Sequence, residues 1–139
     1  IRDRATDREI LERYVLAVFY FSTDGVNWAI KKRDFEFLTG EHICYWNNPA
    51  DDTGVVGVGD GVECGGGLNV ESILLIRVGL NGTIPWELSL LADLSTLILT
   101  RNDLTGSIPT ELCQLSRLEQ FSLSLTINWR EQSRLRLVK

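Results

Sequence analysis

His42, Cys44 and Cys64 are side chains of the kinds that ligate zinc. The two cysteines lie 20 positions apart, whereas zinc sites pair cysteines as C-x2-C. His42 is the single histidine, and no nearby Ser or Cys forms a nucleophile–base arrangement with it. No motif supports the paired carboxylates of a glycoside hydrolase. The sequence therefore predicts a protein without catalytic residues, bound metal or cofactor.

A glycine-rich, acidic stretch precedes Cys64. A phosphate-binding loop needs G-x-G-x-x-G, or G-x-x-x-x-G-K-[ST], but Val62 stands where the third glycine after Gly57-Val58-Gly59 would be, and no Lys follows. The carboxylates that could hold a weak calcium ion are Asp51, Asp52, Asp60 and Glu63. They lack the D-x-D-x-D-G order of a calcium loop, so we expect a solvated loop.

Composition and charge exclude several other classes of protein. With 139 residues and 44 % hydrophobic residues the chain fits one domain with a real core. Residues 1–69 carry 12 acidic and 7 basic side chains, a balance of -5, and residues 70–139 carry 7 of each. This charge is unlike a basic nucleic-acid footprint, and we read the basic residues at the C-terminal end as a solvated tail.

The longest apolar run, Tyr14–Phe21, is too short to cross a bilayer, which takes roughly 20 residues. The acidic residues before it do not suit the n-region of a secretory signal, and the chain begins at Ile1. We expect an internal or processed piece of a longer protein, with any targeting signal outside it.

From Val70 onward the sequence repeats every 24 residues. One copy is 70–93, the next is 94–117, and a partial third covers 118–125 before the pattern is lost. The positions that agree in kind are Val70/Leu94, Ile73/Leu97, Leu75/Leu99, Leu80/Leu104, Gly82/Gly106, Ile84/Ile108, Pro85/Pro109, Glu87/Glu111, Leu88/Leu112 and Leu91/Leu115. Such a period is typical of stacked structural repeats.

Each copy predicts the same local structure. Ile73-x-Leu75 and Leu97-x-Leu99 predict short strands with alternate side chains pointing inward. The glycine that follows each strand, Gly82 or Gly106, suits a tight backbone path, and Pro85 or Pro109 then fixes φ. Two leucines spaced by three residues complete each copy and predict a helical or 3₁₀ turn whose leucines face inward. One copy cannot bury its apolar edge alone, so the copies are expected to stack.

At these residues the chain resembles the plant-type leucine-rich-repeat family, whose pattern is LxxLxLxxNxLxGxIPxxLxxLxx. Receptor-like kinase ectodomains and polygalacturonase-inhibiting proteins belong to this subclass. The resemblance implies an α/β fold: a right-handed leucine-rich-repeat solenoid with a parallel concave sheet. It assigns Asn102 a structural role, hydrogen bonding to the backbone along the turn. Two departures are Val78 at the Asn position of the first copy, and Thr126 and Asn128 at the Asn and Leu positions of the third.

Residues 1–69 resemble the N-terminal helical cap of this family. Thr6-Asp7-Arg8-Glu9 is a capping box, and Ile10, Leu11, Tyr14, Val15 and Val18 follow at helical spacing, which predicts a helix from about Asp7 to Phe21. The C-x-W…G-V-x-C pattern of such caps implies a Cys44–Cys64 disulfide, with a metal site as the alternative. A loop of about 20 residues closed this way is worth roughly 3 kcal/mol. Cys113 is expected to be a free, partly buried thiol, or to pair with another chain.

The resemblance also places the candidate binding residues on the concave sheet. They are Ser72, Leu74, Ile76 and Arg77 in the first copy, Thr96, Ile98, Thr100 and Arg101 in the second, and Gln120, Ser122 and Ser124 in the third. Leu74, Ile76 and Ile98 are expected to be exposed and to form a contact surface. The alternatives are that they lie beneath a neighbouring loop, or that they only raise the propensity of the segment to form a strand. Asn81-Gly82-Thr83 is an N-x-T sequon and makes Asn81 a candidate for glycosylation; its alternative role is the turn that leaves the strand.

Three functions follow from the resemblance. The first is a non-catalytic module that recognises a protein or peptide ligand, at the N-terminal end of an extracellular or cell-surface receptor. The second is a secreted inhibitor of a cell-wall-degrading enzyme, and the third is a structural fragment of a longer array, with 126–139 a degenerate or truncated tail. We expect no nucleic acid partner and flanking repeats in the parent protein. Because three or more repeats are normally needed for stability, the isolated chain is expected to be marginally stable, with its C-terminal edge near Phe121 and Leu123 exposed.

Overall fold

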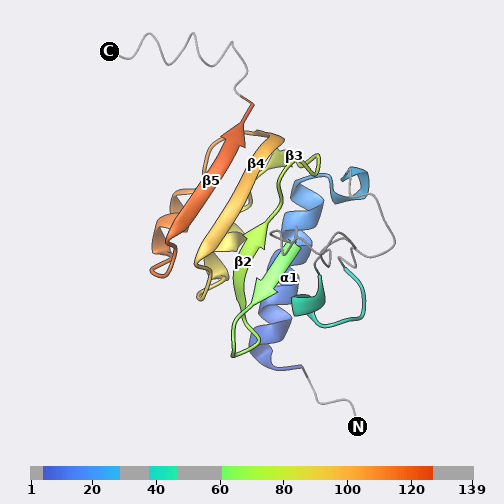
Figure 1. Cartoon of the computed structure of the whole chain (residues 1–139), viewed down its shortest axis with the longest axis vertical. Helices are drawn as coiled ribbons and strands as arrows, with labels where there is room; N and C mark the ends of the chain where they lie inside the picture. Colours follow the sequence, from blue (N-terminus) through green and yellow to red (C-terminus); the bar gives the residue numbers. More distant parts are fainter. Residues whose placement is uncertain (1–4, 29–37, 47–60, 127–139) are drawn as a thin grey trace, which may run out of the picture.

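The computed structural model describes residues 5–28, 38–46 and 61–126. Among these residues one α-helix, α1 (Asp7–Ser22), accompanies an open sheet that extends from in front of the helix to its left in Figure 1. The strands are β1 (Gly61–Cys64), β2 (Val70–Leu74), β3 (Asn81–Thr83), β4 (Thr96–Thr105) and β5 (Gln120–Leu125). Short 3₁₀ turns occupy Gly25–Asn27 (η1), Ile43–Tyr45 (η2), Trp86–Leu90 (η3) and Thr110–Gln114 (η4).

Helix α1 begins where the capping box predicts. The Thr6 hydroxyl accepts a hydrogen bond from the Glu9 N–H at 3.1 Å, and the helix ends one residue later than expected. The expected buried face is wrong in part, since Ile10 is 57 % and Tyr14 54 % exposed. The face that packs on the sheet carries Glu12, Val15, Leu16 and Phe19. A carboxylate therefore replaces an aliphatic residue on the buried side of the helix.

Glu12 is buried because the backbone supplies it with a donor. Its Oε2 accepts the Val70 N–H at 3.1 Å, at the start of β2, and its Oε1 lies 3.4 Å from Arg8 Nε. Arg8 also pairs with Asp93, which in turn lies 3.0 Å from Arg117 Nη1. This chain of charges joins the helix to β2 and to the turns of both repeat copies.

Glu12 gives the fold a specific pH dependence. Burial raises the pKa of Glu12 above its ordinary value and outweighs the Val70 N–H and Arg8, which lower it. The folded chain therefore holds this proton more tightly than the unfolded chain, and the associated stability is present in acid and lost as pH rises through the raised pKa. We expect Glu12→Gln, which keeps the acceptor without the charge, to gain stability relative to the native chain as pH rises from about 4 to 7. Urea unfolding of the two proteins across this range measures the gain, and a pH-independent difference for Glu12→Gln would contradict the assignment.

The parallel strands pair with the period of the sequence. Ser72, Ile73 and Leu74 of β2 face Thr96, Leu97 and Ile98 of β4, and Thr96–Leu99 face Gln120–Leu123 of β5, each pair being 24 residues apart. Further along, β3 pairs with Asp103–Thr105 of β4 at an offset of 22 residues. β1 caps this ladder as an antiparallel strand beside β2. Segments 70–93 and 94–117 therefore contribute successive parallel strands of one sheet.

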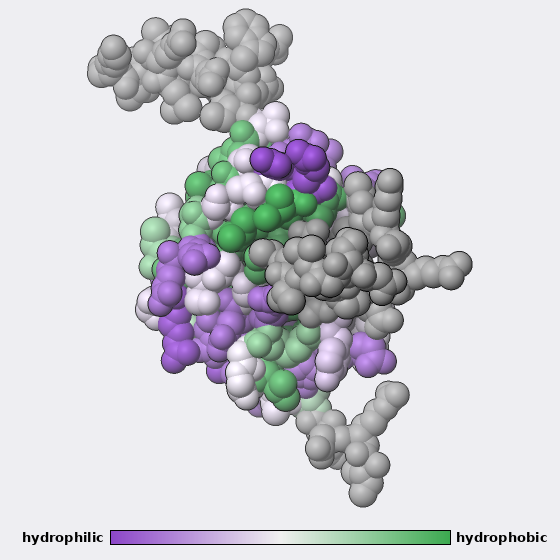
Figure 2. Space-filling view, in the orientation of Figure 1, coloured by the Kyte–Doolittle hydropathy of each residue, from purple (hydrophilic) through white to green (hydrophobic). Residues whose placement is uncertain are grey.

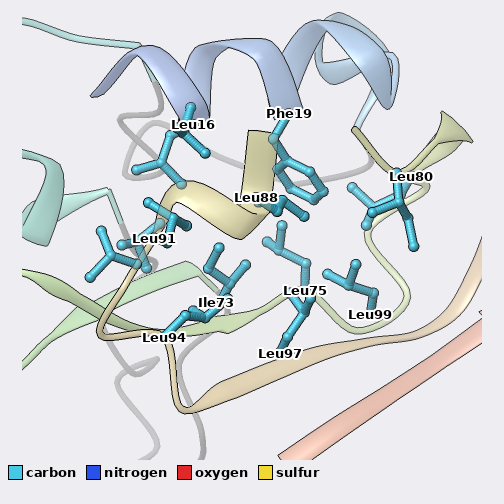
Figure 3. Packing of buried hydrophobic residues seen from close by; sticks show 14 of the residues in the cluster. Leu16, Phe19, Ile73, Leu75, Leu80, Leu88, Leu91, Leu94, Leu97 and Leu99 are labelled. Atoms are coloured by element: carbon cyan, nitrogen blue, oxygen red, sulfur yellow. The ribbon is translucent and has the colours of Figure 1, made fainter. Parts of the chain in front are cut away.

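The core lies between α1, the sheet and the 3₁₀ turns. Figure 3 shows Leu16 and Phe19 of α1 pointing toward Leu88 of η3 and Leu91, which directly follows η3, with Ile73, Leu75, Leu97 and Leu99 beneath them. All eight side chains are fully buried. The inward orientation predicted for the strand and turn residues is thus confirmed at these positions.

The end of α1 approaches β3 closely at Gly82. The Thr23 carbonyl accepts the Asn81 N–H at 3.0 Å, and a Cβ on Gly82, at φ +125°, would lie 2.2 Å from the Ser22 carbonyl oxygen. Glycine is therefore required at this position of the sequon for steric reasons. The Asn81 side chain itself is exposed, and its glycosylation stays a prediction.

Strand β5 forms one edge of the described sheet. Phe121 is 41 % exposed, as predicted for this edge, while Leu123 is half-buried against the core. Edge strands open locally at low free energy because one side of their backbone has no partner. We expect amides of β5 to exchange with solvent more than about tenfold faster than those of Leu97 and Leu99. Hydrogen exchange resolved by residue measures this, and equal protection of β4 and β5 would contradict it.

Candidate binding surface

The outer face of the sheet carries the candidate binding residues. In β4 the side chains alternate, with Leu97 and Leu99 buried and Thr96, Ile98 and Thr100 half-buried. Figure 2, drawn from this side, shows a hydrophobic band across the middle of the molecule and strongly hydrophilic surface beside it. The candidates that reach solvent most fully are Arg77, Arg101, Gln120, Ser122 and Ser124.

The structure brings these residues together as ladders across β2, β4 and β5. Ser72, Thr96 and Gln120 form one row, and Leu74, Ile98 and Ser122 form the next. Beyond the paired part of β2, the Arg77 N–H donates to the Thr100 carbonyl at 3.1 Å. The surface therefore presents rows of side chains contributed by equivalent positions of successive copies.

Leu74 departs from the expectation of an exposed side chain, since it is only 7 % exposed. It pairs with Gly61 of β1 on one side and Ile98 of β4 on the other, so strands flank it on both sides. Ile76 and Ile98 are half-buried. The apolar part of this surface that reaches solvent is accordingly smaller than the sequence predicts.

Asn102 connects the two complete copies through its side-chain amide. Its Oδ1 accepts the N–H groups of Val78, Gly79 and Leu80 at 3.1–3.2 Å, all from the preceding copy. Its Nδ2 donates to the carbonyls of Leu75, Leu99 and Thr100 at 2.7–3.2 Å. The backbone hydrogen bonding expected of Asn102 is confirmed.

The same geometry explains why Val78 can occupy the Asn position of the first copy. The amide acts on the copy that precedes it, and Val78 is preceded by the cap instead of by another copy. Val78 is 4 % exposed and belongs to the core cluster. An apolar side chain suits that position because its surroundings are apolar.

Arg77 and Arg101 are equivalent residues with the same unusual backbone. Both are in the left-handed region, with φ 55° and 59°, and both are exposed. Sequence reasoning identified the pair but could not foresee this conformation, which glycine and asparagine adopt far more readily than arginine. Within the described ranges neither guanidinium forms an ion pair.

The cap disulfide is present between Cys44 and Cys64, whose Cα atoms are 5.3 Å apart. It ties η2 to β1 and takes both thiols out of any metal site. The His42 Nδ1 accepts the Cys44 N–H at 3.2 Å, so this histidine caps η2. Around the disulfide lies a pocket of about 570 Å³ lined by residues that include Tyr45, Glu63 and Leu68. No sequence signal predicted it, because its walls come from separate segments that only the fold brings together.

The remaining predictions concern Cys113, a membrane span, and residues that the structure does not describe. Cys113 is exposed, so the prediction of a partly buried thiol is wrong: the residues of this segment that face the core are Leu112 of η4 and Leu115, which directly follows η4. No helix within the described ranges is long and apolar enough to cross a bilayer. The following lie outside the described residues: Asp51, Asp52, Asp60, the glycines from 54 to 59, Asn128 and the basic tail.

Comparisons with protein-family models, curated proteins and solved structures find no match to this chain.

Proposed function

We propose that this chain is a leucine-rich-repeat recognition module that binds a protein or peptide on the outer face of strands β2, β4 and β5. The observation that carries the proposal is the 24-residue register of the parallel strands, which aligns equivalent side chains into rows on one face. A row of this kind matches the repeating geometry of an extended polypeptide, whose side chains also recur at regular intervals.

The chemistry of the face favours binding over catalysis. Its candidate residues are Ser, Thr, Gln, Arg and aliphatic side chains, which supply hydrogen bonds, charge and apolar contact. The Cys44–Cys64 disulfide supports an oxidising, extracellular setting for such a module. A flanking repeat against the exposed edge of β5 is part of the proposal, since Phe121 offers it an apolar contact.

A random peptide library displayed on phage tests the proposal. Peptides enriched on the folded chain are measured against two matched variants, Ser122→Trp on the outer face of β5 and Ser116→Trp after η4, both at exposed serines of neighbouring segments. Because the bulky, neutral side chain covers the face without changing its charge, we expect at least tenfold weaker binding to Ser122→Trp and unchanged binding to Ser116→Trp. Equal sensitivity to the two variants, or no enriched peptide at all, would overturn the proposal.

A further inference from the structure

We infer that Arg77 and Arg101 form a paired anion-binding subsite for an acidic side chain of the peptide ligand. The inference rests on the proposed function, because it names what the outer face recognises.

The two guanidiniums start from adjacent points of the sheet. The Arg77 N–H donates to the carbonyl of Thr100, the residue just before Arg101, at 3.1 Å. Adjacent strands lie about 5 Å apart, so both side chains leave the backbone within reach of one carboxylate or of two neighbouring carboxylates. Arginine binds such groups through two parallel N–H donors, which adds directional specificity to charge attraction.

Neither side chain is used by the fold. Across the described residues no carboxylate forms an ion pair with Arg77 or Arg101, whereas Arg8 has two such partners and Arg13 and Arg117 have one each. Asp103, two residues beyond Arg101, is exposed and unpaired with it. The two charges are therefore available to a ligand, and their sign is complementary to an acidic peptide.

The backbone provides an observation independent of charge. Both copies hold arginine in the left-handed region, where a Cβ is disfavoured and glycine is not. Residues kept in such conformations cluster at functional sites, where the strain is maintained by the surrounding structure. Two equivalent positions that accept this cost for the same charged residue point to use of the guanidinium itself.

The substitution Arg→Gly separates the two effects. In Arg77→Gly and Arg101→Gly the strain is relieved and the charge lost, so we expect a higher urea midpoint together with weaker binding. Leu68→Gly is the matched control: Leu68 is also exposed and left-handed, at φ 58°, but lies in the turn after β1 and carries no charge. It should raise the midpoint and leave binding unchanged.

The probes are a capped peptide of alternating isoleucine and aspartate, its isoleucine–asparagine counterpart, and inorganic phosphate. Arginine side-chain Nε–Hε signals in NMR report each guanidinium directly. We expect the aspartate peptide to shift both arginine signals, the asparagine peptide to leave them unshifted, and either glycine variant to weaken aspartate-peptide binding about tenfold. Phosphate should cause smaller shifts at equal concentration.

Equal binding of the two peptides, or full binding by the glycine variants, would overturn the subsite. Shifts with phosphate as large as with the aspartate peptide would also overturn it, because they would indicate a site for free anions. The two proposals fail separately: library peptides that lose binding to Ser122→Trp but contain no acidic residue would leave the recognition surface intact and refute only the arginine subsite.

Discussion

Replacing Asn102 by alanine should unfold much of the described sheet at denaturant concentrations that leave the native chain intact. The substitution removes the partner of three N–H groups and three carbonyls, which belong to the turn after β2 and to β4. Asn102 is 8 % exposed, so water can replace its amide only partly. We expect a loss on the order of 3–5 kcal/mol, since each buried polar group left unpaired costs about 1–3 kcal/mol. Urea unfolding followed by circular dichroism measures it.

Two further variants make this prediction specific. Asn102→Asp keeps an acceptor for the three N–H groups but loses the donor and places a charge beside three carbonyl oxygens. Its stability should therefore recover in part as the pH falls and the carboxyl gains a proton that it can donate. Asp103→Ala changes the exposed neighbour and should stay within about 0.5 kcal/mol of the native chain. A small loss for Asn102→Ala, close to that of Asp103→Ala, would show that the network contributes little.

Removing the cap disulfide should have the second largest effect. Cys44 and Cys64 are 20 residues apart in sequence, and opening a loop of that length costs about 3 kcal/mol in the chain-entropy description. The bond also holds η2 to β1, the strand that flanks Leu74. We expect the double variant Cys44→Ala/Cys64→Ala to unfold at a clearly lower urea concentration, and reductant to have the same effect on the native chain.

The free thiol supplies the control. Cys113 is exposed, so Cys113→Ser should leave the urea midpoint unchanged while removing thiol exchange with the disulfide. In that background reductant should still lower the midpoint. An unchanged midpoint under reducing conditions would mean that the cap is held by packing alone.

Sequence reasoning succeeded where the signal is local and periodic. The capping box located the start of α1, because Thr6 and Glu9 interact within one turn. The inward positions of β2 and β4 followed from alternation, and the 24-residue spacing equals the offset at which Ile73 faces Leu97.

It failed where a distant segment decides the outcome. The buried face of α1 carries Glu12, whose burial depends on the N–H of Val70, 58 residues away. No residue near Glu12 in the sequence indicates that this donor will lie beside it. Leu74 is buried beside β1, a strand that lies in the expected cap region and pairs antiparallel to β2. The left-handed backbone at Arg77 and Arg101 was equally hidden, since residue type argues against it.

The position of Asn102 imposes an order on folding while the chain is being synthesised on the ribosome. The turn that it completes spans Leu75 to Leu80. The backbone N–H and carbonyl groups of this turn that bond to Asn102 therefore lack their partner until a residue more than 20 positions later has been synthesised. A nascent chain that has released only the cap and the first 24-residue unit therefore holds an unfinished turn, however well α1 has docked. The first unit is thus completed by the second, and its turn should form only after the second unit has emerged.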